Sequence, residues 1–244
     1  MSADDPIDQN TTPELTETRV KGHTPCTWVL IGTSLAVFSG LAWAVQDKPS
    51  TWDNALLQNV IAIRQPWLTP IVLGVTHSAS IVLLAPLTLL CAYLLWRRAN
   101  KRASFFMGMA MLGSAIINQI AKYSFARHRP PLAQALIEKH SFSFPSGHTM
   151  GMATFGLACL LVVESEWPKH KNSSRWAALI MITLVALSRV YLGVHYPTDV
   201  LASVALSLAW VLTLDRLCAL YATKRRTSFA LTLNSCQTRS PKER

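Results

Sequence analysis

The sequence predicts an all-α, polytopic membrane protein, a bundle of six transmembrane helices. Half of the 244 residues are hydrophobic, 15% are charged, and the mean hydropathy is +0.27. Soluble domains are about 25% charged, so these values argue against an ordinary cytosolic enzyme and exclude a wholly disordered chain. Six apolar segments recur along the chain, and basic residues gather in alternate connections between them. Such alternation is typical of multi-span proteins.

The first apolar segment, residues 26–45, is uncharged. At 1.5 Å per residue it is long enough to cross a hydrocarbon core of about 30 Å. It ends in a sequence that looks like a signal-peptidase site, but the stretch before it is long and acidic, so we expect a retained anchor. The second segment, residues 67–96, is too long for a straight span. Pro70 and Pro86 favour a tilted or kinked helix there, and two short helices are the alternative.

The other four segments are residues 103–121, 149–163, 176–194 and 200–214. The last three are short enough to be core helices, so their membrane assignment depends on the charged connections. Basic groups follow the second, fourth and sixth segments, and they are Arg97, Arg98, Lys101, Arg102, Lys169, Lys171, Arg175, Lys224, Arg225 and Arg226. The positive-inside rule makes this face cytoplasmic and places both termini there.

These segments define three regions: a polar cytoplasmic tail of residues 1–25, a membrane domain of residues 26–220, and a basic cytoplasmic tail of residues 221–244 that we expect to be disordered. The net charge of +10 indicates loops at an anionic membrane face rather than nucleic-acid binding. The five cysteines are scattered, which predicts buried apolar residues rather than disulfides or a zinc site. The sequence leaves the oligomeric state open.

The predicted outer face also carries cations, which are Lys48, Arg64, Lys122, Arg127, Arg129, Lys139 and Arg189. Lys122, Arg129 and Arg189 lie in three polar clusters at the ends of apolar segments. The clusters are residues 122–130, residues 145–148 (Pro-Ser-Gly-His), and residues 188–199, which contain Ser-Arg, His195 and Asp199. The six-span topology places all three clusters on one face, where they can form one pocket.

Each cluster suits the binding of a phosphoryl group. Lys122, Arg129 and Arg189 beside a lipid-facing bundle would be costly without a dianionic partner, and arginine binds two phosphate oxygens at once. Ser146 and Gly147 open a helix whose N–H groups favour an anion, and His148 can reach the same anion. Asp199 can hold one nitrogen of His195 and leave the other as a nucleophile. Singly, each residue has an ordinary explanation, such as snorkelling or an N-cap; three clusters on one face together favour a site.

These clusters closely resemble the three motifs of the type-2 phosphatidic acid phosphatase superfamily: KxxxxxxRP over residues 122–130, PSGH over residues 145–148, and SRxxxxxHxxxD over residues 188–199. No motif residue is missing, and the six-span pattern extends the resemblance over residues 26–220. The resemblance implies a metal-independent phosphatase with no cofactor. It also implies that His195 forms a phosphohistidine oriented by Asp199, and that His148 protonates the leaving oxygen and then activates water. The phosphate would be held by Lys122, Arg129, Arg189, Ser146 and the Gly147 backbone.

We therefore expect a membrane phosphatase that acts on lipid phosphates or diphosphates at the outer face of the cytoplasmic membrane. Undecaprenyl diphosphate is the first expected substrate, phosphatidylglycerophosphate and phosphatidate follow closely, and lipid A phosphate stays open. Its partners would then be this substrate and membrane lipids. No carboxylate-rich or clustered His/Cys set suits a metal ion. The alternatives are an anion transporter, which would need charges along the bundle axis, and a non-catalytic lipid-phosphate-binding protein, which would not need both histidines and Asp199.

Overall fold

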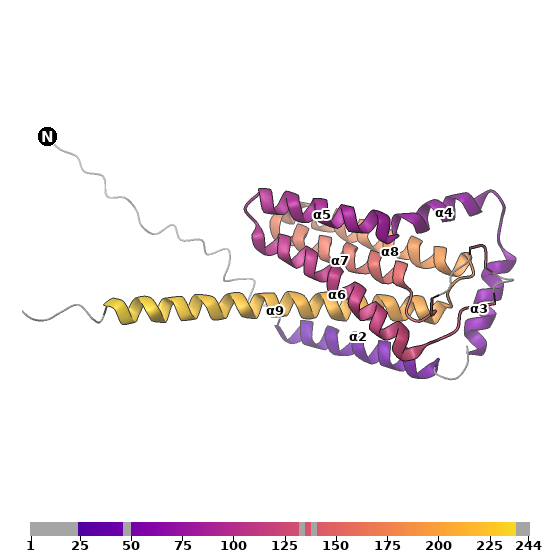
Figure 1. The fold of residues 1–244 in the computed structure, drawn as a ribbon, viewed down its shortest axis with the longest axis horizontal. Coiled ribbons are helices and arrows are strands. Elements are labelled where there is room, and N and C mark those ends of the chain that lie inside the picture. The colour runs from indigo at the N-terminus through magenta and orange to yellow at the C-terminus, as the bar shows by residue number, and fades with distance from the viewer. Residues whose placement is uncertain (1–23, 46–49, 132–134, 138–140, 238–244) are drawn as a thin grey trace, which may run out of the picture.

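The computed structural model describes residues 24–45, 50–131, 135–137 and 141–237, and the regular structure of these residues is entirely helical. The helices are α2 (Thr24–Ala44), α3 (Thr51–Ala62), α4 (Leu68–Ser78), α5 (Ile81–Arg97), α6 (Lys101–Phe125), α7 (Gly147–Glu166), the short 3₁₀ helix η3 (Pro168–His170), α8 (Lys171–Tyr191) and α9 (Pro197–Gln237) (Figure 1). The predicted all-α class is confirmed.

Within the described residues, five stretches are long and apolar enough to cross a membrane: Pro25–Ala44, Lys101–Phe125, Gly147–Glu166, Pro168–Tyr191 and Pro197–Ala222. The pair α4 and α5, bent by 44°, supplies a sixth when counted as one span. These stretches match the six predicted segments in order and make the chain a multi-pass membrane protein.

The bend in the second segment is not at a proline. It lies at Ala79 and Ser80, which end α4 and begin α5. Pro70 lies in the first turn of α4, where a helix does not need its N–H group, and Pro86 lies inside α5, which continues through it. The expected proline kink is therefore wrong, and the alternative of two short helices is the one found.

The bundle is organised around α7, which packs against α5, α6, α8 and α9, whereas α2 packs along α9. Leu95, Met107, Ala158 and Val211 belong to one buried cluster contributed by four of these helices. Gly113 lets α6 approach α9 closely, because a Cβ atom there would lie 2.1 Å from the Trp210 ring.

A helix that the sequence analysis did not assign, α3, runs across the end of the bundle (Figure 1). Its N-cap is Ser50, whose hydroxyl accepts a hydrogen bond of 3.2 Å from the Asp53 amide. The helix buries Asp53 and Leu57 against the bundle, while Trp52 and Leu56 are exposed. This arrangement brings a carboxylate from outside the six segments to the end where the three polar clusters lie.

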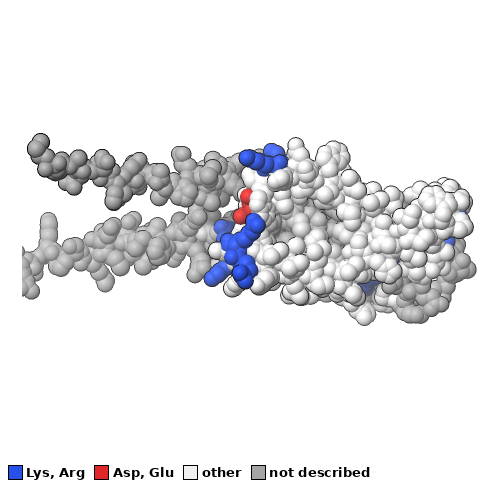
Figure 2. Space-filling view, turned by 90° about the horizontal axis from the view of Figure 1, so that it is seen from above, with Lys and Arg blue, Asp and Glu red and all other residues white. Residues whose placement is uncertain are grey.

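Lysine and arginine gather at the other end of the molecule, as Figure 2 shows. Arg97 ends α5, Lys101 begins α6, and Lys169 and Lys171 lie at the junction of α7 and α8. The bundle therefore has one basic end and, opposite it, the end that carries the motifs.

Two expectations about the outer parts of the chain need correction. The C-terminal tail is not disordered through residue 237, because α9 continues to Gln237 (Figure 1). No glycine or proline follows Pro197 in this stretch to stop the helix. Cys26 is exposed rather than buried, since it lies in the first turn of α2, whereas Cys91, Cys159 and Cys218 are partly buried and free. The predicted N-terminal tail lies outside the described residues, except for Thr24 and Pro25.

Candidate active site

The three polar clusters meet at one end of the bundle. Lys122 lies in the last turn of α6, whose C-cap residue, Ala126, has a φ of 43°. Ser146 is the N-cap of α7, and Arg189 lies in the last turn of α8. Pro197 begins α9, a position that suits proline because its fixed φ fits the first turn. Four helix ends therefore deliver the motif residues to one place.

His195 and Asp199 are both buried and form the predicted pair. The Nδ1 atom of His195 lies 3.4 Å from Oδ2 of Asp199. The same oxygen accepts a hydrogen bond of 2.9 Å from the Tyr196 amide and another from the Ser143 hydroxyl. The carboxylate is thus fixed from several sides, and it faces the Nδ1 edge of the imidazole.

The opposite edge of His195 determines its tautomer. Nη1 of Arg129 lies 3.1 Å from Nε2 of His195. A guanidinium can only donate hydrogen bonds, so Nε2 is the acceptor and the proton of the neutral ring is on Nδ1, toward Asp199. Burial, followed by the positive charges of Arg129, Arg189, Lys122 and His148, holds the pKa of His195 well below its ordinary value. His195 is therefore neutral near pH 7, with its lone pair on Nε2.

Lys122 and Arg129 converge on the chain segment that precedes α7. Lys122 Nζ donates a hydrogen bond to the Phe142 carbonyl, and Nη2 of Arg129 reaches the same carbonyl at 3.3 Å. Arg129 also binds the carbonyls of Ser141 and Val194, at 2.6 and 2.7 Å. Main-chain oxygens thus hold both cations beside the imidazole.

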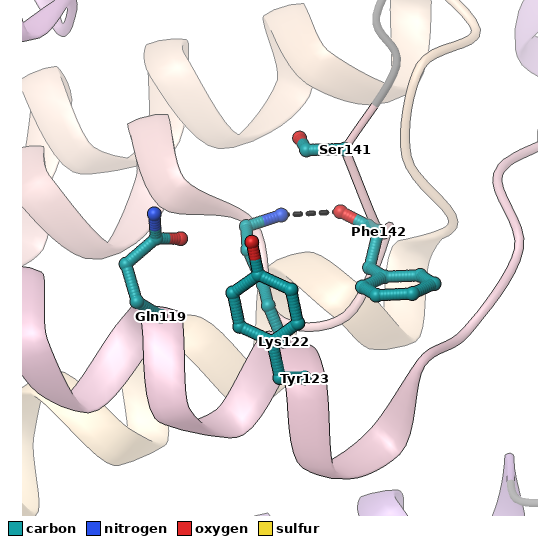
Figure 3. Close-up of a pocket in the computed structure, with 5 residues that line it drawn as sticks. All are labelled: Gln119, Lys122, Tyr123, Ser141 and Phe142. Carbon is teal, nitrogen blue, oxygen red and sulfur yellow. Dashed lines mark hydrogen bonds between the residues drawn. The ribbon is translucent and has the colours of Figure 1, made fainter.

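A cavity of about 200 Å³ opens beside these cations (Figure 3). Gln119, Lys122 and Tyr123 line it from α6, and Ser141 and Phe142 line it from the other side. The Tyr123 ring is largely exposed and packs edge-to-face on Phe142, with centroids 5.8 Å apart. The cavity therefore lies between one predicted site residue, Lys122, and the exposed Tyr123 ring.

Arg189 is the most deeply buried of the three predicted cations, with 1% of its surface exposed. Its Nη1 donates a hydrogen bond of 2.6 Å to the Thr76 hydroxyl on α4. Its Nε atom is buried and has no hydrogen-bond partner within the described residues. A buried guanidinium that has an N–H donor without a partner is suited to binding an anion.

The second motif forms the start of α7. The amide of Ser146 donates a hydrogen bond of 3.3 Å to the Asp199 carbonyl, which ties this helix start to the start of α9. Gly147 permits the close approach of α6, since a Cβ atom there would lie 3.2 Å from Asn118 Oδ1. His148 is half-buried in the first turn of α7, and its charge acts on that of His195.

Four residues around the site were not predicted. Arg127 and Ser143 bind Asp199, Asp53 binds Arg127, and Thr76 binds Arg189. Two of these residues, Arg127 and Asp53, could have been noticed from the sequence. Arg127 was an outer-face cation without an explanation, and Ser50 three residues before Asp53 is a helix N-terminus pattern.

Among the described residues, no group of three or more His, Cys, Asp or Glu side chains could hold a metal ion. That the chain needs neither a metal nor a cofactor stays a prediction.

Several known proteins are similar to this chain in sequence and in fold. The chain is 33% identical over 159 residues to phosphatidylglycerophosphatase B of Bacillus subtilis, an alignment that covers 64% of this chain and 78% of that relative. It is 29% identical over 126 residues to an undecaprenyl-diphosphatase of Sulfolobus acidocaldarius, covering 49% of this chain and 57% of that relative's length. The crystal structure of a transmembrane PAP2 type phosphatidylglycerolphosphate phosphatase from Bacillus subtilis matches with a TM-score of 0.71 at 30% identity, covering 77% of this chain and 94% of that one.

The sequence model of the PAP2 superfamily matches residues 103–225, a range that contains all three motifs. Fold, motif order and relatives agree, and they identify a membrane lipid phosphatase. The chain belongs to the PAP2 superfamily, the type-2 phosphatidic acid phosphatases.

Proposed function

We propose that this phosphatase hydrolyses a lipid phosphate or diphosphate without a metal ion, through a covalent phosphohistidine on His195. The observation that carries the proposal is the orientation of the imidazole. Nδ1 faces Asp199, and the Nε2 lone pair faces the guanidinium of Arg129. A neutral, buried imidazole whose lone pair faces one cation and lies within the field of two more is prepared to attack a phosphorus atom bound by those cations.

In the first step, the Nε2 lone pair of His195 attacks phosphorus and forms an N–P bond. The P–O bond to the lipid breaks, and its electron pair leaves on the lipid oxygen. His148 donates the proton that this oxygen needs. As the imidazole becomes positively charged, Asp199 stabilises it across the Nδ1 proton.

In the second step, water attacks the phosphohistidine. His148, now neutral, takes a proton from the water, the N–P bond breaks, and its electron pair returns to His195. Lys122, Arg129 and Arg189 bind the phosphoryl oxygens throughout, together with Ser146 and the N–H groups at the start of α7. These donors stabilise the charge of the transition state.

The substrate is a lipid whose head group enters through the cavity beside Lys122. Gln119 and Tyr123 line this cavity and would contact the group next to the reacting phosphate, either a glycerol or a second phosphate. Similarity to phosphatidylglycerophosphatase B favours phosphatidylglycerophosphate, and similarity to undecaprenyl-diphosphatase favours undecaprenyl diphosphate. Phosphatidate offers the same phosphomonoester without the added group.

The site faces outward across the cytoplasmic membrane, and both termini are cytoplasmic. The charge distribution supports this orientation, because the basic residues gather at the end opposite the site (Figure 2). Positively charged loops are retained on the cytoplasmic side.

Phosphate release by the purified, detergent-solubilised protein tests the proposal. Phosphatidylglycerophosphate, undecaprenyl diphosphate and phosphatidate are compared with EDTA present. We expect wild-type activity in EDTA and none above background in His195→Ala. His77→Ala is the matched control, because His77 is exposed and its Nδ1 bonds to the Leu73 carbonyl of its own helix. Wild-type activity that EDTA abolishes and an added metal restores would overturn the metal-independent mechanism.

A further inference from the structure

A buried ion-pair chain joins α3 to the carboxylate of the site. The Arg127 guanidinium, whose side chain is 6% exposed, places Nη2 2.7 Å from Oδ2 of Asp53. Its Nη1 donates to Oδ1 of Asp199 and, at 2.8 Å, to the Thr198 hydroxyl. Both carboxylates are fully buried. One guanidinium thus bridges two carboxylates that are 146 positions apart in the sequence.

The two oxygens of Asp199 have separate partners. Oδ2 faces His195 and accepts from Ser143 and Tyr196, whereas Oδ1 is held by Arg127. Arg127 therefore fixes the rotation of the carboxylate that presents Oδ2 to the imidazole. Since an ionised carboxylate is costly to bury without a cation, Arg127 also keeps this group in its charged form.

Asp53 in turn holds Arg127. It pairs with Nη2 and also accepts hydrogen bonds from the amide and hydroxyl of Thr198, the amide at 3.0 Å. The Arg127 guanidinium lies 4.3 Å from the centroid of the Tyr196 ring. Asp53 thereby orients the guanidinium and shares its positive charge, so that Asp199 keeps more of its own negative charge for His195.

We propose that Asp53 and Arg127 are positioning residues of the phosphatase reaction, acting on His195 through Asp199. This inference rests on the proposed function. Neither residue belongs to the three motifs, since Arg127 occupies a variable position of the first and Asp53 lies on α3. Because their side chains contact one another and Thr198, Asp199 and Tyr196, they should affect the chemical step rather than substrate binding.

The competing explanation is that the ion pairs merely hold α3 against the bundle. A matched variant separates the two roles. Leu57 lies one turn after Asp53 on the same buried face of α3, with 1% of its surface exposed. Leu57→Ala removes packing against Val190, Tyr196 and Val200 and loosens the same helix, but it leaves both ion pairs intact.

The test measures kcat and KM for phosphate release, and the rate of phosphoenzyme formation in a single turnover. It compares wild type, Asp53→Asn, Asp53→Glu, Arg127→Lys, Leu57→Ala and His195→Ala. Asp53→Asn keeps the size of the side chain but loses the charge. We expect it to lower kcat and the phosphoenzyme rate by about 10-fold while KM stays within about 2-fold. Asp53→Glu should recover part of the loss. Leu57→Ala should lower thermal stability at least as much as Asp53→Asn while retaining most of kcat.

The direction in which the acid limb of the pH profile of kcat/KM shifts gives a second readout. The charged groups that act on His195 are Arg129, Arg189, Lys122 and His148 from three helices and the connecting chain, opposed by Asp199. Removing the negative charge of Asp53 adds to the net positive field, so the acid limb of kcat/KM should move to lower pH. Removing the positive charge in Arg127→Gln should move it to higher pH. A purely structural role would move neither.

A kcat for Asp53→Asn equal to that of wild type overturns the positioning role, as does an equal loss of kcat in Leu57→Ala. If Arg127→Gln fails to fold, Asp53→Asn still decides, because it keeps the size of the side chain and removes only its charge. Failure of the proposed function would look different: wild type would release no phosphate, or His195→Ala would still form phosphoenzyme, and this inference would then fall with it.

Discussion

Arg189→Lys is the substitution whose effect the geometry defines most closely. It keeps one positive charge in the site and replaces the planar fork with a single ammonium. In the structure, Nη1 of Arg189 binds Thr76 at 2.6 Å, and the buried Nε is without a partner among the described residues. The arginine can therefore keep its bond to Thr76 and offer other N–H groups to a phosphoryl oxygen.

A lysine ammonium at this position must serve both Thr76 and the phosphate with one nitrogen. At least one charge-assisted hydrogen bond to the phosphoryl group is lost. Hydrogen bonds to charged groups contribute about 1.5–3 kcal/mol, and about 1.4 kcal/mol corresponds to a tenfold change in rate. We therefore expect kcat/KM of Arg189→Lys to fall by roughly 10- to 150-fold.

The assay is phosphate release from a soluble short-chain lipid phosphate, with kcat and KM determined separately and folding checked by thermal unfolding in detergent. Arg64→Lys is the matched control, because Arg64 lies at the same end of the bundle and its Nε donates to the Tyr191 carbonyl at 2.7 Å. This control should change kcat/KM by less than about 2-fold. Near-normal kinetics for a well-folded Arg189→Lys would refute the assignment of Arg189 to the phosphate.

Three further predictions concern the histidines, pH and topology. His195→Ala should form no phosphoenzyme from an activated aryl phosphate, whereas His148→Ala should still form it, because an aryl leaving group hardly needs a proton; labelling that survives only in His195→Ala would reverse the two roles. Burial and the surrounding cations hold the pKa of His195 well below its ordinary value, so the acid limb of kcat/KM, where His195 gains a proton, should lie well below pH 6.5; an acid limb centred at or above pH 6.5 would contradict a neutral nucleophile. In a background without native cysteines, an impermeant thiol reagent applied to intact cells should label Ile63→Cys but not Lys101→Cys, and the opposite pattern would invert the proposed topology.

The sequence predicted the parts of the fold that depend on contiguous stretches of chain. The length of an uncharged run determines whether it can span a bilayer, and basic connections determine the face. The three clusters and their resemblance to the family motifs likewise predicted eight site residues, and the structure brings these residues to one end of the bundle. Each of these signals can be read within a few neighbouring residues, which explains why they were visible without coordinates.

The residues that were missed depend on partners far along the chain. Thr76 binds a residue 113 positions away, and Asp53 binds residues 74 and 145 positions away. An isolated threonine in an apolar helix, or one aspartate after an N-cap, gives no local indication of such a partner. The bend between α4 and α5 was misplaced for a related reason: the prolines are the visible helix breakers, but the chain turns at Ala79 and Ser80.

The charges of the site divide into two groups with different tasks. Lys122, Arg129 and Arg189 all act on His195, with Arg129 at its Nε2 edge and Lys122 on the wall of the cavity, and a phosphate dianion would lie among them. Asp53, Arg127 and Asp199 lie behind the imidazole and carry one net negative charge together. In the proposed attack, electron density would move from His195 toward phosphorus, so the ring would become positive while the phosphoryl oxygens and the leaving group would gain negative charge. Both groups favour that movement of charge. The three cations attract the electron density that reaches the phosphoryl group, and the net negative charge beside Nδ1 stabilises the positive ring. All three cations of the first group are motif residues, whereas the second group adds Arg127 and, from α3, Asp53 to the motif residue Asp199. We therefore expect a mutation of Asp53 to impair the reaction without altering a motif residue.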